Sequence, residues 1–232
     1  MKIFLKIIAS LLLILSILIG YMSLIGFETK RFNDQITKEV ENINKDLKIE
    51  LKEIRIILDP INFKLKAKTI KSKLKNKNKI LDIQNIKIQI PIESLLSEKI
   101  LIENAEILTE KLQIKDLISF IRVFNRNPEF YLLEKIIDRG FLIADIKLNF
   151  DKEGNIKNDY RINGFVKDLN INFLKKYKLK NFSSDFDYKK ASLDLKNISF
   201  LFNDLKLNSK VFNVKNLKNE FIVKGELDNK NT

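Results

Sequence analysis

The feature that most constrains this chain is an alternation of apolar and polar residues that begins near Leu47 and recurs in most segments that follow. In residues 86–90, for example, three isoleucines alternate with Lys87 and Gln89. Successive side chains of a β-strand point to opposite faces of its sheet, so a period of two gives each strand one apolar and one polar face. The sequence therefore predicts a mainly β protein whose apolar strand faces must be covered by something.

Predicted strands occupy most of the chain after residue 46. They are residues 47–51, 54–58, 61–67, 81–90, 100–107, 142–150, 160–166, 169–173, 182–188, 193–202, 205–207, 211–214 and 221–227. One-residue slips in the alternation, after Leu51 and after Ile83, indicate β-bulges that re-aim the apolar face. Turns are expected at Asp59-Pro60 and at residues 152–155, and Pro91 is expected to end a strand. Short connections after residue 140 predict antiparallel neighbours in a meander.

Two or three short helices are expected to interrupt the strands. Residues 93–98 resemble one helical turn, and Asp116 can cap a helix that reaches Phe124. Asn127 and Pro128 can open another helix, which Gly140 is expected to stop.

The first segment carries nineteen residues without a charge, from Ile7 to Ile25. At a rise of about 1.5 Å per residue it spans roughly 28 Å, close to the hydrocarbon thickness of a bilayer. It predicts an uncleaved transmembrane anchor. The alternative is a cleaved signal peptide, but that requires a shorter apolar region and a small-x-small cleavage site, which Tyr21 and Met22 do not provide.

Lysines near the N-terminus are nearly balanced by Lys30 and Arg31 on the other side of the apolar segment. The tendency of basic residues to stay in the cytoplasm therefore does not by itself fix the orientation of the anchor in the membrane. Long domains that follow an anchor translocate largely regardless of charge. We therefore expect a single-pass protein of the bacterial inner membrane with its N-terminus in the cytoplasm and its bulk in the periplasm. After the anchor, an apolar stripe of Phe32, Ile36, Val40, Ile43 and Leu47 predicts an amphipathic helix.

These patterns divide the chain into four regions. They are a transmembrane signal anchor at 1–27, an amphipathic helix at 28–46, a strand and helix region at 47–139, and an antiparallel β meander at 140–232. The predicted fold is an antiparallel, twisted and curved sheet that forms a half-open groove, preceded by a transmembrane helix.

Composition removes most enzyme classes. The chain contains no Cys and no His, which excludes thiol nucleophiles, imidazole bases and nearly all zinc, copper or haem ligation. Only 6 Gly and 3 Pro leave no phosphate-cradling loop. We therefore expect no enzymatic activity, no cofactor and no metal site.

The net charge of +13 raises nucleic acid and anionic membranes as partners. The basic residues are 37 Lys and 6 Arg, however, whereas phosphate and base-edge recognition favours Arg. Ile, Lys and Asn together fill 98 of the 232 positions, which is typical of an AT-biased genome. We expect no nucleic-acid partner.

Two segments carry a resemblance to the AsmA-like family of bacterial envelope proteins, the YhdP/TamB type, which is related to bridge-like lipid-transfer proteins. They are residues 86–107 (I-K-I-Q-I-P-I-E-S-L-L-S-E-K-I-L-I-E-N-A-E-I) and 160–173 (Y-R-I-N-G-F-V-K-D-L-N-I-N-F), and the anchor followed by an amphipathic helix is similar too. The chain resembles the N-terminal part of such proteins. The resemblance implies a long, twisted, U-shaped sheet whose concave apolar face holds lipid acyl chains between the inner and outer membranes.

The predicted site is this apolar face, with phospholipid as its ligand. The residues expected to line it are Ile49, Leu51, Ile56, Phe63, Leu65, Ile86, Ile88, Ile90, Ile102, Ile146, Leu148, Phe150, Ile162, Ile171 and Phe200. The alternative is a closed sandwich in which the same side chains form an ordinary core.

Eight lysines between residues 64 and 79 form the densest charge feature. Lys64, Lys66 and Lys68 could contact anionic headgroups near a membrane surface. The alternative is a solvated outer strand face and hairpin tip.

The preferred hypothesis is thus a membrane-anchored AsmA-like protein that contributes to lipid transport or envelope assembly. The second hypothesis is an anchored periplasmic scaffold, similar to LptC, that docks another β-protein through its final strand. Ten to twelve strands reach only about 50 to 60 Å, so the chain is too short to span a periplasm alone.

Overall fold

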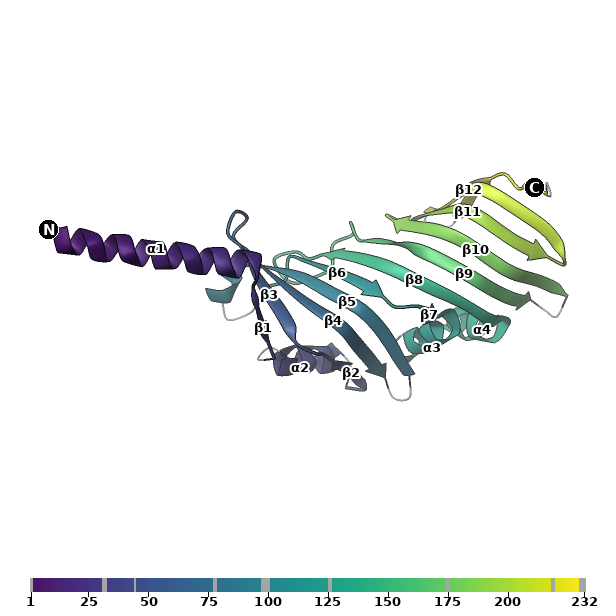
Figure 1. Cartoon of the computed structure of the whole chain (residues 1–232). Helices are drawn as coiled ribbons and strands as arrows, with labels where there is room; N and C mark the ends of the chain where they lie inside the picture. The colour runs from purple at the N-terminus through teal and green to yellow at the C-terminus, as the bar shows by residue number, and fades with distance from the viewer. Residues whose placement is uncertain are drawn as a thin grey trace.

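A computed structural model describes residues 2–30, 33–43, 45–76, 79–96, 101–124, 127–173, 176–217 and 220–229. It confirms the predicted fold class, because 58% of the chain is strand and the strands form one large, open antiparallel sheet (Figure 1). Phe32 and Ile100, which belong to predicted elements, lie outside the described residues.

The sheet is a meander in which almost every strand pairs with the next along the chain. Its order is β1-β3-β4-β5-β6-β8-β9-β10-β11-β12-β13, with β2 paired to β4 and β7 paired to β8. The strands are β1 (Phe27–Thr29), β2 (Leu47–Glu50), β3 (Ile54–Asp59), β4 (Lys64–Asn76), β5 (Lys79–Pro91), β6 (Asn104–Thr109), β7 (Leu112–Gln113), β8 (Ile137–Asn149), β9 (Arg161–Phe173), β10 (Tyr177–Lys189), β11 (Ser192–Phe202), β12 (Leu205–Leu217) and β13 (Glu220–Gly225).

The helices are α1 (Lys2–Leu24), α2 (Asn33–Ile43), α3 (Ile114–Phe124) and α4 (Pro128–Ile136), with a 3-10 turn η1 (Ile92–Leu96). Within the predicted anchor and amphipathic-helix regions, residues 27–29 form β1 and the amphipathic helix occupies only 33–43. The sheet is continuous across the predicted boundary at residue 140, which β8 crosses.

Helix α4 begins as predicted, because the side chain of Asn127 accepts a hydrogen bond from the backbone N–H of Glu129 (3.0 Å) and Pro128 occupies the first turn. Its predicted end at Gly140 is wrong. The chain changes to extended backbone at Ile137, and Gly140 instead lies inside β8. There a Cβ would stand 2.8 Å from the Cα of Leu169, so the glycine permits close contact with β9.

Helix α1 is 23 residues long, apolar enough to span a membrane, and projects from the sheet (Figure 1). At its C-terminus the N–H groups of Ile25 and Gly26 both donate to the carbonyl of Tyr21, and Gly26 has the positive φ of 71° that is common where a helix ends. A Cβ on Gly26 would lie 2.3 Å from the carbonyl oxygen of Ile56. The helix therefore ends directly against β3.

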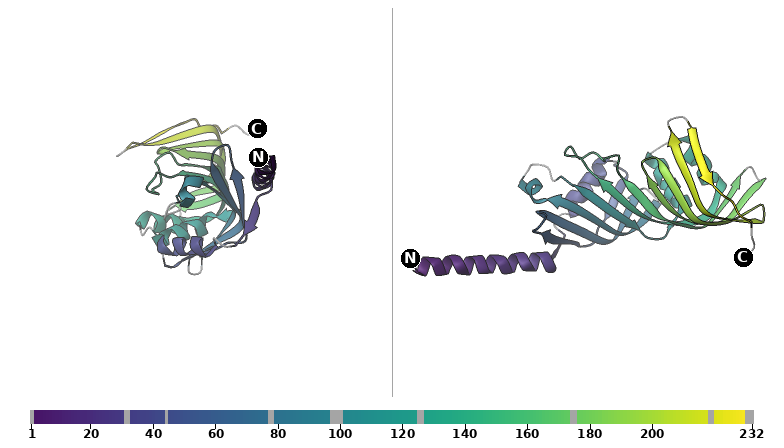
Figure 2. Two further views of the ribbon diagram at one scale, coloured as in Figure 1. Left: turned by 90° about the vertical axis from the view of Figure 1, so that its left-hand side faces the viewer. Right: turned by 90° about the horizontal axis from the view of Figure 1, so that it is seen from above.

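The long strands contain bulges near their middle. Residues with positive φ lie inside β4 (Lys71), β9 (Asp168), β10 (Asn181) and β11 (Asn197), and the β5–β6 register shifts between Ile83 and Asn85, at the predicted slip. Bulges in neighbouring strands increase twist and bend a sheet. This row of bulges, called the bulge seam below, accounts for the curvature visible in Figure 2.

Short polar side chains satisfy the backbone at the bulge seam. Thr109 accepts from the N–H of Ala144 (2.9 Å), Ser183 from that of Asp168 (3.3 Å), and the Ser184 hydroxyl donates to the carbonyl of Lys196 (2.9 Å). Buried backbone groups are costly when unpaired, so these contacts stabilise the bends.

The bulges also explain where the predicted strand pattern differs from the structure. Segments 160–166 and 169–173 are one strand, β9, and segments 205–207 and 211–214 are one strand, β12. The slip after Leu51 is a break between β2 and β3, which pair with the two halves of β4.

Candidate functional site

One face of the sheet carries apolar side chains in register from strand to strand. Directly paired residues point to the same side of a sheet. Successive pairings join Ile54, Thr69, Ile86, Ile107, Ile146, Ile162, Tyr188, Leu193, Val214 and Val223 into a single row. The row crosses ten strands and contains no charged residue, and we call this side of the sheet the apolar face.

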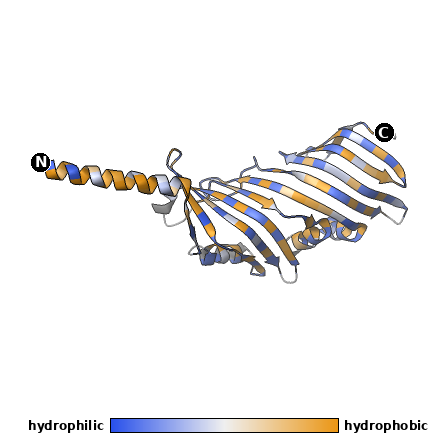
Figure 3. Ribbon diagram, viewed as in Figure 1, coloured by the Kyte–Doolittle hydropathy of each residue, from blue (hydrophilic) through white to orange (hydrophobic). Residues whose placement is uncertain are grey.

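A second row of paired residues shows that the apolar face is wider than one residue per strand. It joins Ala144, Gly164, Phe186, Leu195, Phe212 and Gly225 through β8 to β13. On β10 and β11, Phe182 and Phe200 add an aromatic pair with ring centroids 6.0 Å apart. Figure 3 shows the resulting alternation of apolar and polar positions along the strands.

Helices α2, α3 and α4 lie on the concave side of the curved sheet (Figures 1 and 2). Val40 of α2 and Phe120 of α3 pack against Leu47 and Leu81, while Ile36 of α2 packs against the cluster around Ile54. The apolar face is therefore the concave one. Its covered part lies near β2, β3 and the first half of β5, and helices α3 and α4 extend the cover to parts of β7, β8 and β9.

Most of the remaining apolar face is only half-buried, although Ile198 on β11 is buried. Ile86, Ile146, Ile162, Leu195 and Val214 all have intermediate exposure, and Val223 at the far edge is 58% exposed. Among the described residues no second sheet lies over this face. The closed-sandwich alternative therefore does not describe this structure.

The accessible area of the whole chain agrees with this open arrangement. It is 16801 Å², whereas a compact monomer of 27.2 kDa is expected to expose about 10,900 Å². The helix α1, in which no residue is buried, and the uncovered sheet both contribute to the excess.

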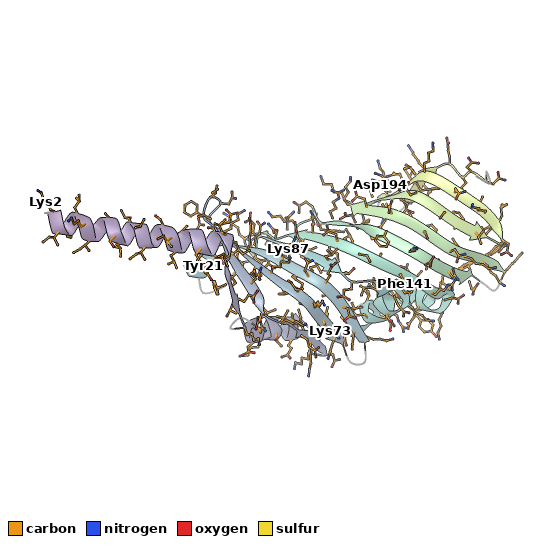
Figure 4. The ribbon with its side chains drawn as sticks, in the orientation of Figure 1. Lys2, Tyr21, Lys73, Lys87, Phe141 and Asp194 are labelled. Atoms are coloured by element: carbon orange, nitrogen blue, oxygen red, sulfur yellow. The ribbon has the colours of Figure 1, made fainter. Side chains whose placement is uncertain are left out.

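The opposite, convex side is charged, and we call it the polar face. Lys87 and Lys147 flank Glu106 at 3.5 and 3.6 Å, and Arg161 binds Asp187 through two hydrogen bonds of 2.8 and 2.7 Å. These pairs alternate with the rows of the apolar face (Lys87 and Asp194 are labelled in Figure 4). Paired charges across neighbouring strands stabilise a solvated sheet surface.

Hydrogen bonding with Arg161 lowers the pKa of the Asp187 carboxyl, and the same contact raises the pKa of Arg161. On the apolar face, a hydrogen bond with Tyr160 raises the pKa of Tyr188 above its ordinary value.

Most of the predicted lining residues come together on the apolar face. They are Ile49 on β2, Ile56 on β3, Leu65 on β4, Ile86, Ile88 and Ile90 on β5, Ile146 and Leu148 on β8, Ile162 and Ile171 on β9, and Phe200 on β11. Ile56 is buried, near Ile36 of α2, and so belongs to the covered part.

The other four predicted lining residues lie outside the regular strands. Leu51 lies between β2 and β3, Ile102 precedes β6, and Phe150 follows β8 in an isolated bridge with Ile156. Phe63 is in the turn before β4 with a φ of 52° and is 69% exposed, because the preceding turn continues to residue 63 and the strand begins only at Lys64. It is not part of the apolar face.

The predicted headgroup lysines are paired with carboxylates or lie on the polar face. Lys64 is 2.7 Å from Glu103 and Lys66 is 2.8 Å from Asp59. Lys68 is half-buried and paired in register with Arg55 and Lys87.

The predicted lining omits several residues of the apolar face, notably Ile107, Phe186, Leu193, Leu195 and Phe212. Their segments carry the same alternation, so the signal is present in the sequence. From β9 to β12, the apolar residues share one face only because bulges occur at Asp168, Asn181 and Asn197. The sequence signal for such a bulge is an Asp or Asn at the position where the alternation of apolar and polar residues shifts by one.

Within the described part of the chain, no group of three or more metal-binding side chains occurs. Comparison with known proteins found no matching family model, no matching curated protein and no matching solved structure.

Proposed function

We propose that this protein is a membrane-anchored lipid-binding protein whose apolar face holds phospholipid acyl chains. One observation carries the proposal: a charge-free row crosses ten strands in register, and from Ile86 on β5 to Val223 on β13 its side chains are only half-buried or exposed. Large contiguous apolar surfaces on soluble domains mark ligand or membrane contacts.

Acyl chains are a suitable ligand on energetic grounds. A half-buried Ile or Leu leaves roughly 30 to 50 Å² exposed, and covering that area contributes about 1 kcal/mol per side chain at about 25 cal/mol per Å². Hydrocarbon tails make no hydrogen bonds, so they lose nothing on a face without charged groups.

The direction of the rows fits movement away from a bilayer. The sheet starts beside the end of α1 and continues away from it strand by strand (Figure 1). Rows run across the strands, so the apolar face extends from the membrane side outward for about 43 Å over the nine inter-strand steps that join ten strands. In the proposed arrangement α1 spans the bacterial inner membrane, the N-terminus is cytoplasmic, and the sheet lies in the periplasm.

This arrangement agrees with what the AsmA-like resemblance implies, a role in lipid transport or outer-membrane assembly. Since about 43 Å is far shorter than a periplasm, the chain would hand lipid to, or accept it from, a further component.

The test is lipid occupancy measured by native mass spectrometry after mild detergent extraction. Leu195→Asn places an amide on the apolar face, and Lys196→Asn changes the adjacent exposed residue on the polar face of the same strand. We expect co-purified phospholipid in the unmodified protein and in Lys196→Asn, and at least a several-fold loss in Leu195→Asn. Equal occupancy in the two variants, or lipid-free unmodified protein, would refute the proposal.

A second candidate function, an LptC-like scaffold, is favoured by the last strand. Strand β13 (Glu220–Gly225) pairs with β12 on one side, and among the described residues its other edge has no strand partner. Val223 of β13 is 58% exposed. An open edge can accept a strand from another β-protein. Crosslinks from Val223 to a β-rich partner in intact cells would support this function, and their absence would remove its main support.

A further inference from the structure

The turn between β3 and β4 presents two apolar side chains to solvent. Ile61 is 86% exposed and Phe63 is 69% exposed, and neither belongs to the apolar face. Such exposure is unusual for large apolar residues in a short turn, where polar residues are the norm.

The turn is held in one conformation. The Asp59 carboxylate accepts hydrogen bonds from the backbone N–H (3.2 Å) and side-chain amide (3.0 Å) of Asn62, and the Lys66 ammonium lies 2.8 Å from it. The backbone N–H of Ile92 donates to the carbonyl of Phe63 (2.9 Å), which ties the turn to η1. The exposed side chains are therefore presented by an ordered support.

The turn lies beside the end of α1. Phe27 pairs with Ile56 and β1 leads away from α1, so the antiparallel β3 runs back toward it. Asp59 is three residues past Ile56, or about 10 Å along the strand. Helix α1 contacts β3, and Figures 1 and 2 place the β3–β4 turn next to the last turns of the helix.

Helix α1 carries an interface marker at the same end. Tyr21, labelled in Figure 4, is 51% exposed near the C-terminal end of the helix. Tyr side chains gather where hydrocarbon meets headgroups. The β3–β4 turn thus lies at the depth where a bilayer surrounding α1 would end.

We propose that the β3–β4 turn is a second membrane contact, with Ile61 and Phe63 inserted into the headgroup region beside α1. This inference rests on α1 spanning a membrane, as proposed above, but not on lipid occupying the apolar face. Lys64 and Lys66 next to the turn are paired with Glu103 and Asp59, so the contact rests on the two exposed apolar side chains rather than on charge. Two contacts fix the tilt of the sheet, so that the apolar face begins at the membrane surface.

The chain has no native Cys, so single-cysteine variants can be labelled without further changes. Ile61→Cys is the probe, and Ile156→Cys is the matched control, because Ile156 is 54% exposed and lies in the β8–β9 connection. That connection is four strands further along the sheet, about 19 Å away. Both variants of the full chain carry an NBD fluorophore and are reconstituted in vesicles of three parts phosphatidylcholine to one part phosphatidylglycerol.

We expect blue-shifted NBD emission at position 61, with at least two-fold stronger quenching by headgroup-region spin-labelled lipid than at position 156. Iodide in the aqueous phase should show the reverse order. Equal emission and quenching at the two positions would overturn the inference. A second result would also overturn the inference: position 61 stays shielded in detergent, and two copies of the unlabelled Ile61→Cys variant form a disulfide crosslink. That result would identify a second copy of the chain, rather than a bilayer, as the partner of the turn.

A variant that folds poorly would be detected by its β-sheet circular dichroism, and Phe63→Cys then serves as the second probe with the same expected outcome. Native mass spectrometry of Ile61→Cys distinguishes this inference from the proposed function. If position 61 is not shielded from water but the protein still carries lipid, only the turn contact is refuted. If position 61 is shielded but the protein carries no lipid, only the lipid-binding face is refuted.

Discussion

At the residue scale, the curvature of the sheet depends on side chains that tolerate a positive φ. Asn and Asp accept this conformation at low cost, and three of the bulge residues, Asp168, Asn181 and Asn197, are of this kind. Lys71 is the exception, since its φ of 55° is costly for a residue with a long side chain.

Lys71 therefore provides a test of the bulge seam. We expect Lys71→Gly to raise the free energy of unfolding by up to about 1 kcal/mol, because glycine relieves the left-handed backbone. Lys73→Gly, two residues further along the same strand and not in that conformation, should lower it by about 0.5–1 kcal/mol. Urea unfolding followed by circular dichroism measures both, and equal destabilisation by the two glycines would contradict the assigned bulge.

The polar face gives a pH prediction. Arg161 lowers the pKa of Asp187, so this carboxylate stabilises the folded state above the unfolded pKa of about 4, and the contribution is lost as the pH falls through the lower folded pKa. Asp187→Asn should cost less than about 1 kcal/mol at pH 7 and almost nothing in strong acid. A double-mutant cycle with Arg161→Ala, repeated at both pH values, checks this; a coupling that survives in strong acid would be inconsistent with it.

At the element scale, periodicity predicts the strands well but not their ends. The alternation in β5 and its stop at Pro91 can be read from the sequence because proline removes a ladder donor. The join of α4 to β8 at Ile137 cannot, because Ile136 and Ile137 continue the apolar spacing of a helix, and only contacts with β9 decide that Ile137 is extended and buried.

Helix α3 secures the covered end of the apolar face. Phe120 is 5% exposed in a cluster with Leu47, Leu81 and Leu112. Phe120→Ala should therefore cost about 3–5 kcal/mol in unfolding free energy, whereas Tyr131→Ala on α4, where the side chain is 52% exposed, should cost less than about 1 kcal/mol. Thermal unfolding in detergent compares them, and similar losses would mean that α3 does not anchor the sheet.

At the scale of the whole molecule, the sequence predicts a sheet with one apolar face but not whether that face is closed. Both outcomes use the same alternation at Ile86, Ile88 and Ile162. The choice depends on how far the bulges bend the sheet and where α2 and α3 pack, which are long-range contacts. The structure leaves the face open, and the site residues on β10 to β12 follow from that geometry.

The measurement that tests the central claim most directly is photo-crosslinking along one strand in intact membranes. Benzoylphenylalanine replaces, one at a time, residues 193, 194, 195 and 196 of β11, which alternate between the two faces. Lipid adducts, identified by mass spectrometry, should form at positions 193 and 195 and be absent at 194 and 196. Adducts on both faces alike, or on neither, would contradict a lipid-binding apolar face.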